Sequence, residues 1–182
     1  MRSEGVNEIL TAPPAAPSSW ERFEALYRSS RDDVYAYVCT LLRDPAAAED
    51  VTALAFERAY RRRRTFDRRR GEERAWLFGI ARNAALDELR RRRRVATLVT
   101  EPADETVSAE DEDEAEVALR RTALQAAMAK LPAREREIVA LKFHAGLTND
   151  ELARVLGVSE SNAGTLLYRT MEKLRKACNA TD

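Results

Sequence analysis

The segment 147–176 constrains the fold most strongly, because its residues specify two consecutive helices and the turn between them. Thr148 and Glu151 have the spacing of a capping box, in which each side chain accepts a hydrogen bond from the other residue's backbone amide. Gly157 is a natural stop for that first helix, and a longer helix with a polar face follows. Two helices joined by a short glycine turn are typical of a helix-turn-helix, whose second helix enters the major groove of DNA.

The rest of the chain also favours helix. Only 6 of the 182 residues are glycine and 6 are proline, whereas alanine, leucine, glutamate and arginine abound. Asp44 and Pro45 supply an N-cap and a first-turn proline for one helix. Apolar residues recur at helical spacing in four stretches upstream of residue 95, namely 20–27, 34–42, 51–60 and 76–86.

We therefore predict an all-α protein with two small helical domains. The first is a four-helix bundle over residues 20–94, and the second is a helix-turn-helix domain over residues 117–180. Residues 95–116 lack helical periodicity and are rich in acids, so we predict a flexible linker that is extended by self-repulsion. Residues 1–19 are rich in alanine, proline and serine, which predicts a disordered leader.

Charge is strongly segregated along the chain, although the formal net charge is zero. Residues 61–94 contain fourteen arginines and five acidic residues, whereas residues 101–116 contain nine acidic residues and no basic one. Arginine pairs with phosphate through two parallel hydrogen bonds and stays charged. Aromatic rings such as Phe66, Trp76 and Phe78 lie between these arginines and can stack on unpaired bases, at ~1–3 kcal/mol per base. The basic block therefore favours contact with single-stranded or melted DNA.

A second interpretation of the basic block stays open at this point. Trp76 and Phe78 at helical spacing are, taken singly, more often core residues than stacking platforms. The run Arg90–Arg94 is also compatible with a solvated helix end that the helix dipole favours.

The sequence offers no sign of an enzyme, and we expect no cofactor, no metal and no small-molecule substrate. It contains no phosphate-binding loop and no set of nucleophile, base and acid. Cys39 and Cys178 lie outside any metal-binding or redox motif, and the single histidine, His144, has no cluster of ligands around it. No apolar run of ~18 residues and no signal peptide is present, so we expect a cytoplasmic protein without membrane insertion.

Three stretches resemble the extracytoplasmic-function sigma factors of the sigma-70 superfamily. Residues 74–91, which read RAWLFGIARNAALDELRR, look like the promoter-melting helix of that family. Residues 44–60 look like its polymerase-binding helix, and residues 131–175 look like its second domain. The resemblance covers about residues 20–94 and 117–178.

The resemblance implies a promoter-specificity subunit of bacterial RNA polymerase. The first domain would bind the clamp helices of core RNA polymerase and capture the melted minus-ten promoter element. The second would read the minus-thirty-five element as duplex and rest on the polymerase flap. The acidic linker would lie in the basic channel of the polymerase, which its charge suits. An anti-sigma factor is a possible further partner.

The resemblance also assigns roles to individual residues. Those implied in minus-ten DNA binding are Arg74, Trp76, Arg82, Asn83, Asp87, Arg90 and Arg91. Those implied in minus-thirty-five binding, on the polar face of the last helix, are Ser161, Asn162, Thr165 and Arg169. Those implied in polymerase binding are Asp50, Phe56, Glu57 and Arg58. The loop 65–71 sits where the family holds a flipped base, an extrusion that costs a few kcal/mol.

The sequence departs from the family pattern at four positions. Ala53 and Leu54 stand where the family usually has a glutamine and an acid, which affects polymerase docking. Gly164 and Leu166 stand where it more often has basic residues. Leu166 either touches a thymine methyl or packs inside the domain.

Two other functions remain as alternatives. The first is a stand-alone regulator that uses its helix-turn-helix on an operator, which predicts a dimer on a palindromic site. No extended apolar heptad offers a dimer seam, which weighs against it. The second is a sigma-like decoy that titrates polymerase, an idea that the departures at Ala53 and Leu54 support.

Overall fold

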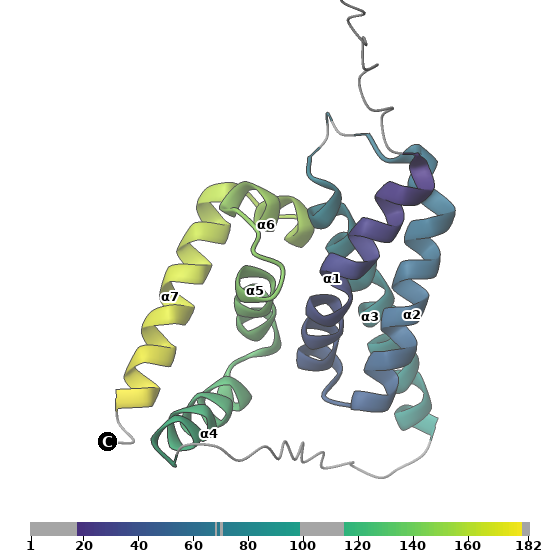
Figure 1. Cartoon of the computed structure of the whole chain (residues 1–182). Coiled ribbons are helices and arrows are strands. Elements are labelled where there is room, and N and C mark those ends of the chain that lie inside the picture. The colour runs from purple at the N-terminus through teal and green to yellow at the C-terminus, as the bar shows by residue number, and fades with distance from the viewer. Residues whose placement is uncertain (1–17, 68, 70, 99–114, 180–182) are drawn as a thin grey trace, which may run out of the picture.

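The computed structural model describes residues 18–67, 69, 71–98 and 115–179. Most of the predicted leader and of the predicted linker lies outside these residues. Two helical units lie side by side (Figure 1). The N-terminal unit holds α1 (Ser19–Leu42), α2 (Pro45–Arg62), the short 3-10 helix η1 (Arg63–Thr65) and α3 (Glu73–Leu98). The C-terminal unit holds α4 (Ala115–Lys130), α5 (Ala133–Phe143), α6 (Asn149–Leu156) and α7 (Glu160–Asn179).

The all-α prediction is confirmed, because the described ranges contain helices and no strand. The predicted four-helix bundle is corrected to three long helices. The two helices expected over 20–27 and 34–42 are one continuous helix, α1. The polar stretch between them contains no glycine or proline, so nothing breaks the helix there.

The ends of α1 and α2 are fixed by local side chains. Ser18 caps α1 by accepting from the Glu21 amide at 3.1 Å, and the Glu21 carboxylate accepts from the Ser18 amide at 2.6 Å. Ser18 and Ser19, which fall in the range predicted as leader, therefore belong to the start of α1. Asp44 caps α2 as predicted, accepting from the Ala47 amide at 3.1 Å, and Pro45 is the first helical residue.

The core of the N-terminal unit is built from the inner faces of α1, α2 and α3. Val34 and Tyr37 of α1 and Leu77 and Phe78 of α3 are fully buried. The rings of Tyr37 and Phe78 meet edge to face, with centroids 5.5 Å apart. Phe78 is therefore a core residue. For this ring, the structure favours the interpretation as core over the interpretation as a platform for base stacking.

The helix-turn-helix forms as its local signals predict. Thr148 Oγ1 accepts from the Glu151 amide at 3.3 Å, and the Glu151 carboxylate accepts from the Thr148 amide at 2.8 Å. Gly157 ends α6 in the left-handed conformation, with φ +68°. Leu147 and Leu152 are buried in the core of this unit.

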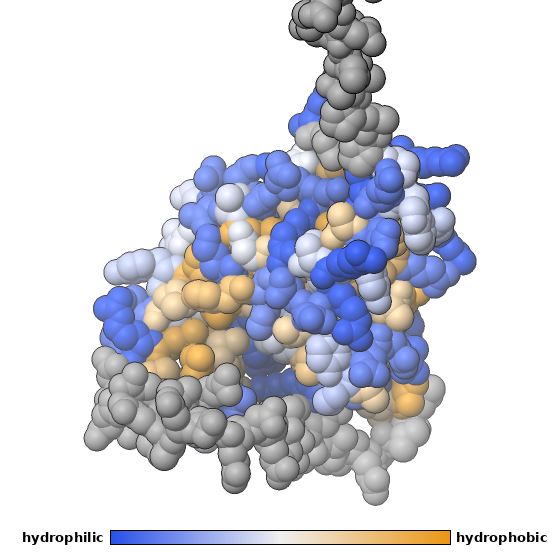
Figure 2. All heavy atoms as spheres, viewed as in Figure 1, coloured by the Kyte–Doolittle hydropathy of each residue, from blue (hydrophilic) through white to orange (hydrophobic). Residues whose placement is uncertain are grey.

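The face of the molecule seen in Figure 2 differs between the two units. In Figure 2 the face over α1–α3 is mostly hydrophilic, whereas hydrophobic residues gather over the lower part of the C-terminal unit. Exposed large hydrophobic residues of that unit include Leu124, Phe143 and Tyr168. No helix in the described part of the chain combines the length and the apolar character needed to cross a membrane.

Candidate nucleic-acid interface

The predicted minus-ten residues of α3 divide into two sets. Asn83, Asp87, Arg90 and Arg91 are exposed on the outer face of the helix. Arg74 and Arg82 are partly covered, with side chains 32% and 22% exposed. The first set is exposed to solvent, although Asp87, Arg90 and Arg91 form ion pairs within the N-terminal unit. The second set is bonded to groups of α1 and of the C-terminal unit.

Arg74 makes five hydrogen bonds at the start of α3. Its guanidinium donates to Asp33 at 2.6 Å and to Ser30 at 3.1 Å, both on α1. It also donates to the carbonyls of His144 and Ala145 in the C-terminal unit, at 2.9 Å and 2.6 Å. These carbonyls follow the negative end of the α5 dipole, which favours a cation. Arg74 therefore joins the two units.

Arg82 joins the units at a second point. Its Nε donates to Glu137 of α5 at 2.7 Å, and the Tyr37 hydroxyl donates to the same carboxylate oxygen at 3.4 Å. Burial and the Glu137 carboxylate hold the pKa of Tyr37 well above its usual value, so the phenol remains a donor. No local sequence pattern marks Glu137, because its partners lie 55 and 100 residues earlier in the chain.

The run of arginines at the end of α3 is not uniform. Arg91 bonds both oxygens of Glu88 at 2.7 Å and 2.8 Å, and Arg92 bonds Glu88 at 2.9 Å and Asp44 at 2.6 Å. Hydrogen bonds from Arg91 and Arg92 lower the pKa of Glu88 to about 2. Arg92 is 27% exposed and ties α3 to the N-cap of α2, whereas Arg94 is exposed.

A cleft of about 430 Å³ lies beside the predicted base-holding loop. Phe66 of that loop and Trp76 of α3 line one side, with ring centroids 5.2 Å apart. Arg154 and Val155 of α6 line the other side. One wall of the cleft beside this loop therefore belongs to the helix-turn-helix.

The predicted polymerase-binding residues lie on α2. Asp50 and Glu57 are exposed, and Arg58 bonds Asp87 of α3 at 3.4 Å. Phe56 is 5% exposed and packs against the Tyr27 ring, so it belongs to the core and does not reach a partner directly. Of the two departures on α2, Ala53 is exposed and Leu54 packs against the core.

The outer face of α7 carries all the predicted minus-thirty-five residues, and each of them is exposed. Ala163 and Thr170 are buried on the inner face, and Leu166 packs against the core, which favours the packing interpretation for Leu166. Tyr168 was missed, although it is 69% exposed. It lies three residues after Thr165, so helical spacing alone would have found it.

Comparison with known proteins agrees with this architecture. Residues 26–95 match Sigma-70 region 2, and residues 121–174 match Sigma-70 region 4. These two regions define a promoter-directing subunit of RNA polymerase. The chain belongs to the extracytoplasmic-function group of the sigma-70 family, which confirms the resemblance found in the sequence.

Relatives support the same group. The chain is 35% identical over 158 residues to the ECF RNA polymerase sigma factor BldN of Streptomyces coelicolor, covering 86% of this chain and 60% of that protein. It is 26% identical over 156 residues to the ECF RNA polymerase sigma factor SigM of Bacillus subtilis, covering 86% of this chain and 94% of SigM.

Two solved structures share the fold. The sigma factor RpoE in complex with the anti-sigma factor NepR from Bartonella quintana superposes with a TM-score of 0.73 at 20% identity, covering 87% of this chain and 97% of that one. CnrH in complex with the cytosolic domain of CnrY gives a TM-score of 0.62 at 26% identity, covering 88% and 89%.

Proposed function

We propose that this chain binds core RNA polymerase and starts transcription at particular promoters. The N-terminal unit, over residues 20–94, would capture the melted minus-ten element. The C-terminal unit, over residues 117–180, would read the minus-thirty-five element as duplex. The observation that carries the proposal is the presence of both sigma regions on one chain, each with an exposed polar face of the kind its DNA element requires.

Melting would be driven by selective binding. The guanidinium groups of α3 suit phosphates, and the cleft beside Phe66 and Trp76 suits an unpaired base. A site that binds only the unpaired strand shifts the duplex toward the melted state. Because such binding involves no covalent step, the chain needs no catalytic group or cofactor, and the polymerase performs the chemistry.

Duplex reading would fall to the outer face of α7. Asn162 can form two hydrogen bonds with adenine, and Arg169 can bond a phosphate or guanine. A well-placed pair of hydrogen bonds from a side chain to a base edge is worth ~1–3 kcal/mol of discrimination between bases. Tyr168 shares this exposed face and can add contact area against the backbone.

Docking to the polymerase would use the exposed face of α2, with Asp50 and Glu57 as contacts. Leu54 packs against the core, so that departure removes little from the docking face, whereas Ala53 is exposed on α2. The decoy alternative therefore rests on the departure at Ala53 alone. We also propose an anti-sigma partner, because the sigma factor RpoE, which shares this fold, is in complex with the anti-sigma factor NepR. Since the polymerase and the chromosome are cytoplasmic, the chain would act there.

Reconstitution with core bacterial RNA polymerase tests the proposal. We expect open complexes on a subset of promoter fragments from a genomic library. The N162A/R169A variant should lose about tenfold or more of this activity, as expected for base contacts of this kind. The K176A variant alters an exposed residue of α7 that lies two turns beyond Arg169 and is not among the predicted DNA contacts, and it serves as the matched control.

Three results would contradict the proposal. Tight binding to an operator without polymerase would support the stand-alone regulator. Polymerase binding without initiation on any fragment would support the decoy. Equal loss of open-complex formation in N162A/R169A and in K176A would show that Asn162 and Arg169 do not read the DNA sequence.

A further inference from the structure

An aromatic cluster lies where the start of α1 meets the end of α2, at the same end of the N-terminal unit as η1 (Figure 1). The Tyr60 ring is at its centre. It meets the Trp20 ring edge to face, with centroids 5.9 Å apart, and the Phe23 ring with centroids 5.1 Å apart. The Arg63 guanidinium lies over the Tyr60 ring, 3.8 Å from its centroid, and donates to the Tyr60 carbonyl at 2.7 Å. These contacts hold the Trp20 ring at the surface.

Trp20 is unusually open for a tryptophan. It is 56% exposed, whereas Trp76, the other tryptophan of the chain, is partly buried. Tryptophan is strongly buried on average, and exposed tryptophan is enriched where proteins bind partners. The match to Sigma-70 region 2 begins at residue 26, so Trp20 and Phe23 lie before it. The exposed ring is therefore a feature of this chain to which the family resemblance assigns no role.

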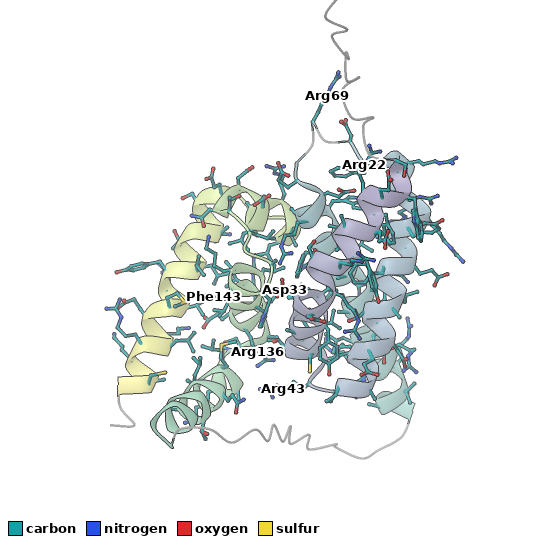
Figure 3. All side chains as sticks on the ribbon, in the orientation of Figure 1. Arg22, Asp33, Arg43, Arg69, Arg136 and Phe143 are labelled. Carbon is teal, nitrogen blue, oxygen red and sulfur yellow. The ribbon has the colours of Figure 1, made fainter. Side chains whose placement is uncertain are left out.

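Arginines border the aromatic cluster. Figure 3 shows Arg22 of α1 and Arg69 of the loop at the same end of the N-terminal unit. Residues 61–64 are four consecutive arginines, of which Arg62 and Arg64 are exposed. Arginine binds phosphate through two parallel hydrogen bonds. An exposed aromatic ring with a basic border is the composition of sites that bind single-stranded nucleic acid.

The cluster also continues the cleft beside the predicted base-holding loop. Arg62 and Phe66 line that cleft, and Tyr60 lies two residues before Arg62. The segment 61–66 advances by about 12 Å at the 2.0 Å rise of a 3-10 helix. A stacked strand advances about 3.4 Å per nucleotide, so this distance corresponds to about three or four nucleotides. One unpaired strand can therefore reach both the cleft and Trp20.

We infer that Trp20, held by Tyr60 and Arg63, is a stacking platform for a second unpaired base of the promoter strand, about three or four nucleotides from the base in the cleft. Arg62 and Arg64 bind the phosphates between the two bases. The inference rests on the proposed function for the identity of the strand. Because purines have larger rings than pyrimidines and stack more strongly, the platform favours a purine at the second position.

Bubble promoter DNA bound by the chain in complex with core polymerase tests the platform. The fragment is one on which the unaltered chain initiates, with 2-aminopurine placed in turn at each unpaired position of each strand. Stacking on a ring quenches the fluorescence of 2-aminopurine. We expect two quenched positions on one strand, about three or four nucleotides apart. Trp20→Leu should restore the fluorescence at one of them, and Trp20→Phe at neither.

Affinity for the same bubble measures the size of the effect. Trp20→Leu should weaken binding about five- to tenfold, at the lower end of the range for one base stacked on an aromatic ring. An abasic nucleotide at the position that Trp20 quenches should weaken binding by the unaltered chain by the same factor. It should weaken binding by Trp20→Leu no further, because the two changes remove one interaction.

The arginine border is tested by salt titration of the same complex. Arg64→Ala should lower the slope of log affinity against log salt by about 0.7, the value for one phosphate contact on a single strand. Arg31→Ala is the matched control, because Arg31 is exposed about three turns further along α1 and should leave the slope unchanged. Circular dichroism confirms that each variant remains folded.

Three outcomes would overturn the inference. The first is equal quenching and equal affinity in Trp20→Leu and the unaltered chain. The second is a loss in Trp20→Leu that adds to the loss from the abasic nucleotide, since Trp20 would then act elsewhere than on that base. The third is loss of polymerase binding in Trp20→Leu, which would assign the ring to a protein partner.

Failure of the proposed function is read separately, as absence of initiation by the unaltered chain with core polymerase. In that case a single-stranded DNA of randomised sequence replaces the bubble, and fluorescence anisotropy measures its binding to the free chain. Weaker binding by Trp20→Leu than by Trp20→Phe would still support a stacking platform. Equal binding by the two variants would overturn it.

Discussion

Arg92 and Arg94 belong to one run of arginines, but they lie in different surroundings in the structure. Arg92 bonds Asp44 and Glu88 and is 27% exposed, whereas Arg94 is exposed on the last turns of α3. We predict that Arg92→Ala mainly lowers the free energy of unfolding. Arg94→Ala should mainly lower the number of phosphates bound.

The magnitude follows from what each substitution removes. Arg92→Ala deletes two charge-assisted hydrogen bonds of 2.6 Å and 2.9 Å. Asp44 still accepts from the Ala47 amide and Glu88 still pairs with Arg91, so no carboxylate is left without a partner. For a partly exposed ion pair we expect a loss of about 1–2 kcal/mol. Arg94→Ala should change stability by less than about 0.5 kcal/mol.

Urea denaturation followed by circular dichroism measures the first effect. A loss of about 1–2 kcal/mol corresponds to a midpoint about 0.5–1 M lower. The D44N variant keeps an N-cap but loses the charge, so a double-mutant cycle with Arg92→Ala isolates the pair. A coupling energy near zero in that cycle would show that Arg92 and Asp44 do not stabilise each other, which would refute the link between α3 and the N-cap of α2.

Salt titration of polymerase-bound protein on melted promoter DNA measures the second effect. Each lost phosphate contact on a single strand lowers the slope of log affinity against log salt by about 0.7. Arg94→Ala should show that change and Arg92→Ala should not. The opposite pattern would refute the division of the run.

Two further predictions concern stability. Gly157→Ala should cost about 1 kcal/mol in urea denaturation, because φ is +68° and an alanine there is strained although no atom lies close. Gly79→Ala, inside α3 with open space around it, is the control and should stabilise by about 0.5–1 kcal/mol; a loss at both positions would contradict the argument from φ. Glu88 has a pKa of about 2 against its ordinary value of 4.5, so its contribution is present above pH 4.5 and is lost as the pH falls toward 2. The unfolding free energy of E88Q should therefore vary less across that pH window than that of the unaltered chain, and equal slopes would argue against the pairing.

Local features were predictable from the sequence because they depend on neighbouring residues. The Asp44 cap, the Thr148 capping box and the turn at Gly157 all form as predicted, since each joins groups only a few residues apart. Helical periodicity likewise gave the all-α class and the exposed face of α7. The same periodicity predicted a break between two helices where the structure has the single helix α1. A polar stretch without glycine or proline changes which face of a helix is exposed but leaves its backbone continuous.

The residues alone thus determined the helices, their caps and the family, whereas tertiary structure decided which arginines are free to bind a partner. Arg82 meets Glu137 across 55 positions, Arg74 meets Ala145 across 71, and Arg92 meets Asp44 across 48. No periodicity encodes such pairs, because an exposed arginine and a paired one look alike in a helical pattern. The packing of α1 against α5 and of α3 against α6 brings the first two pairs together, and the packing of α2 against α3 brings the third together.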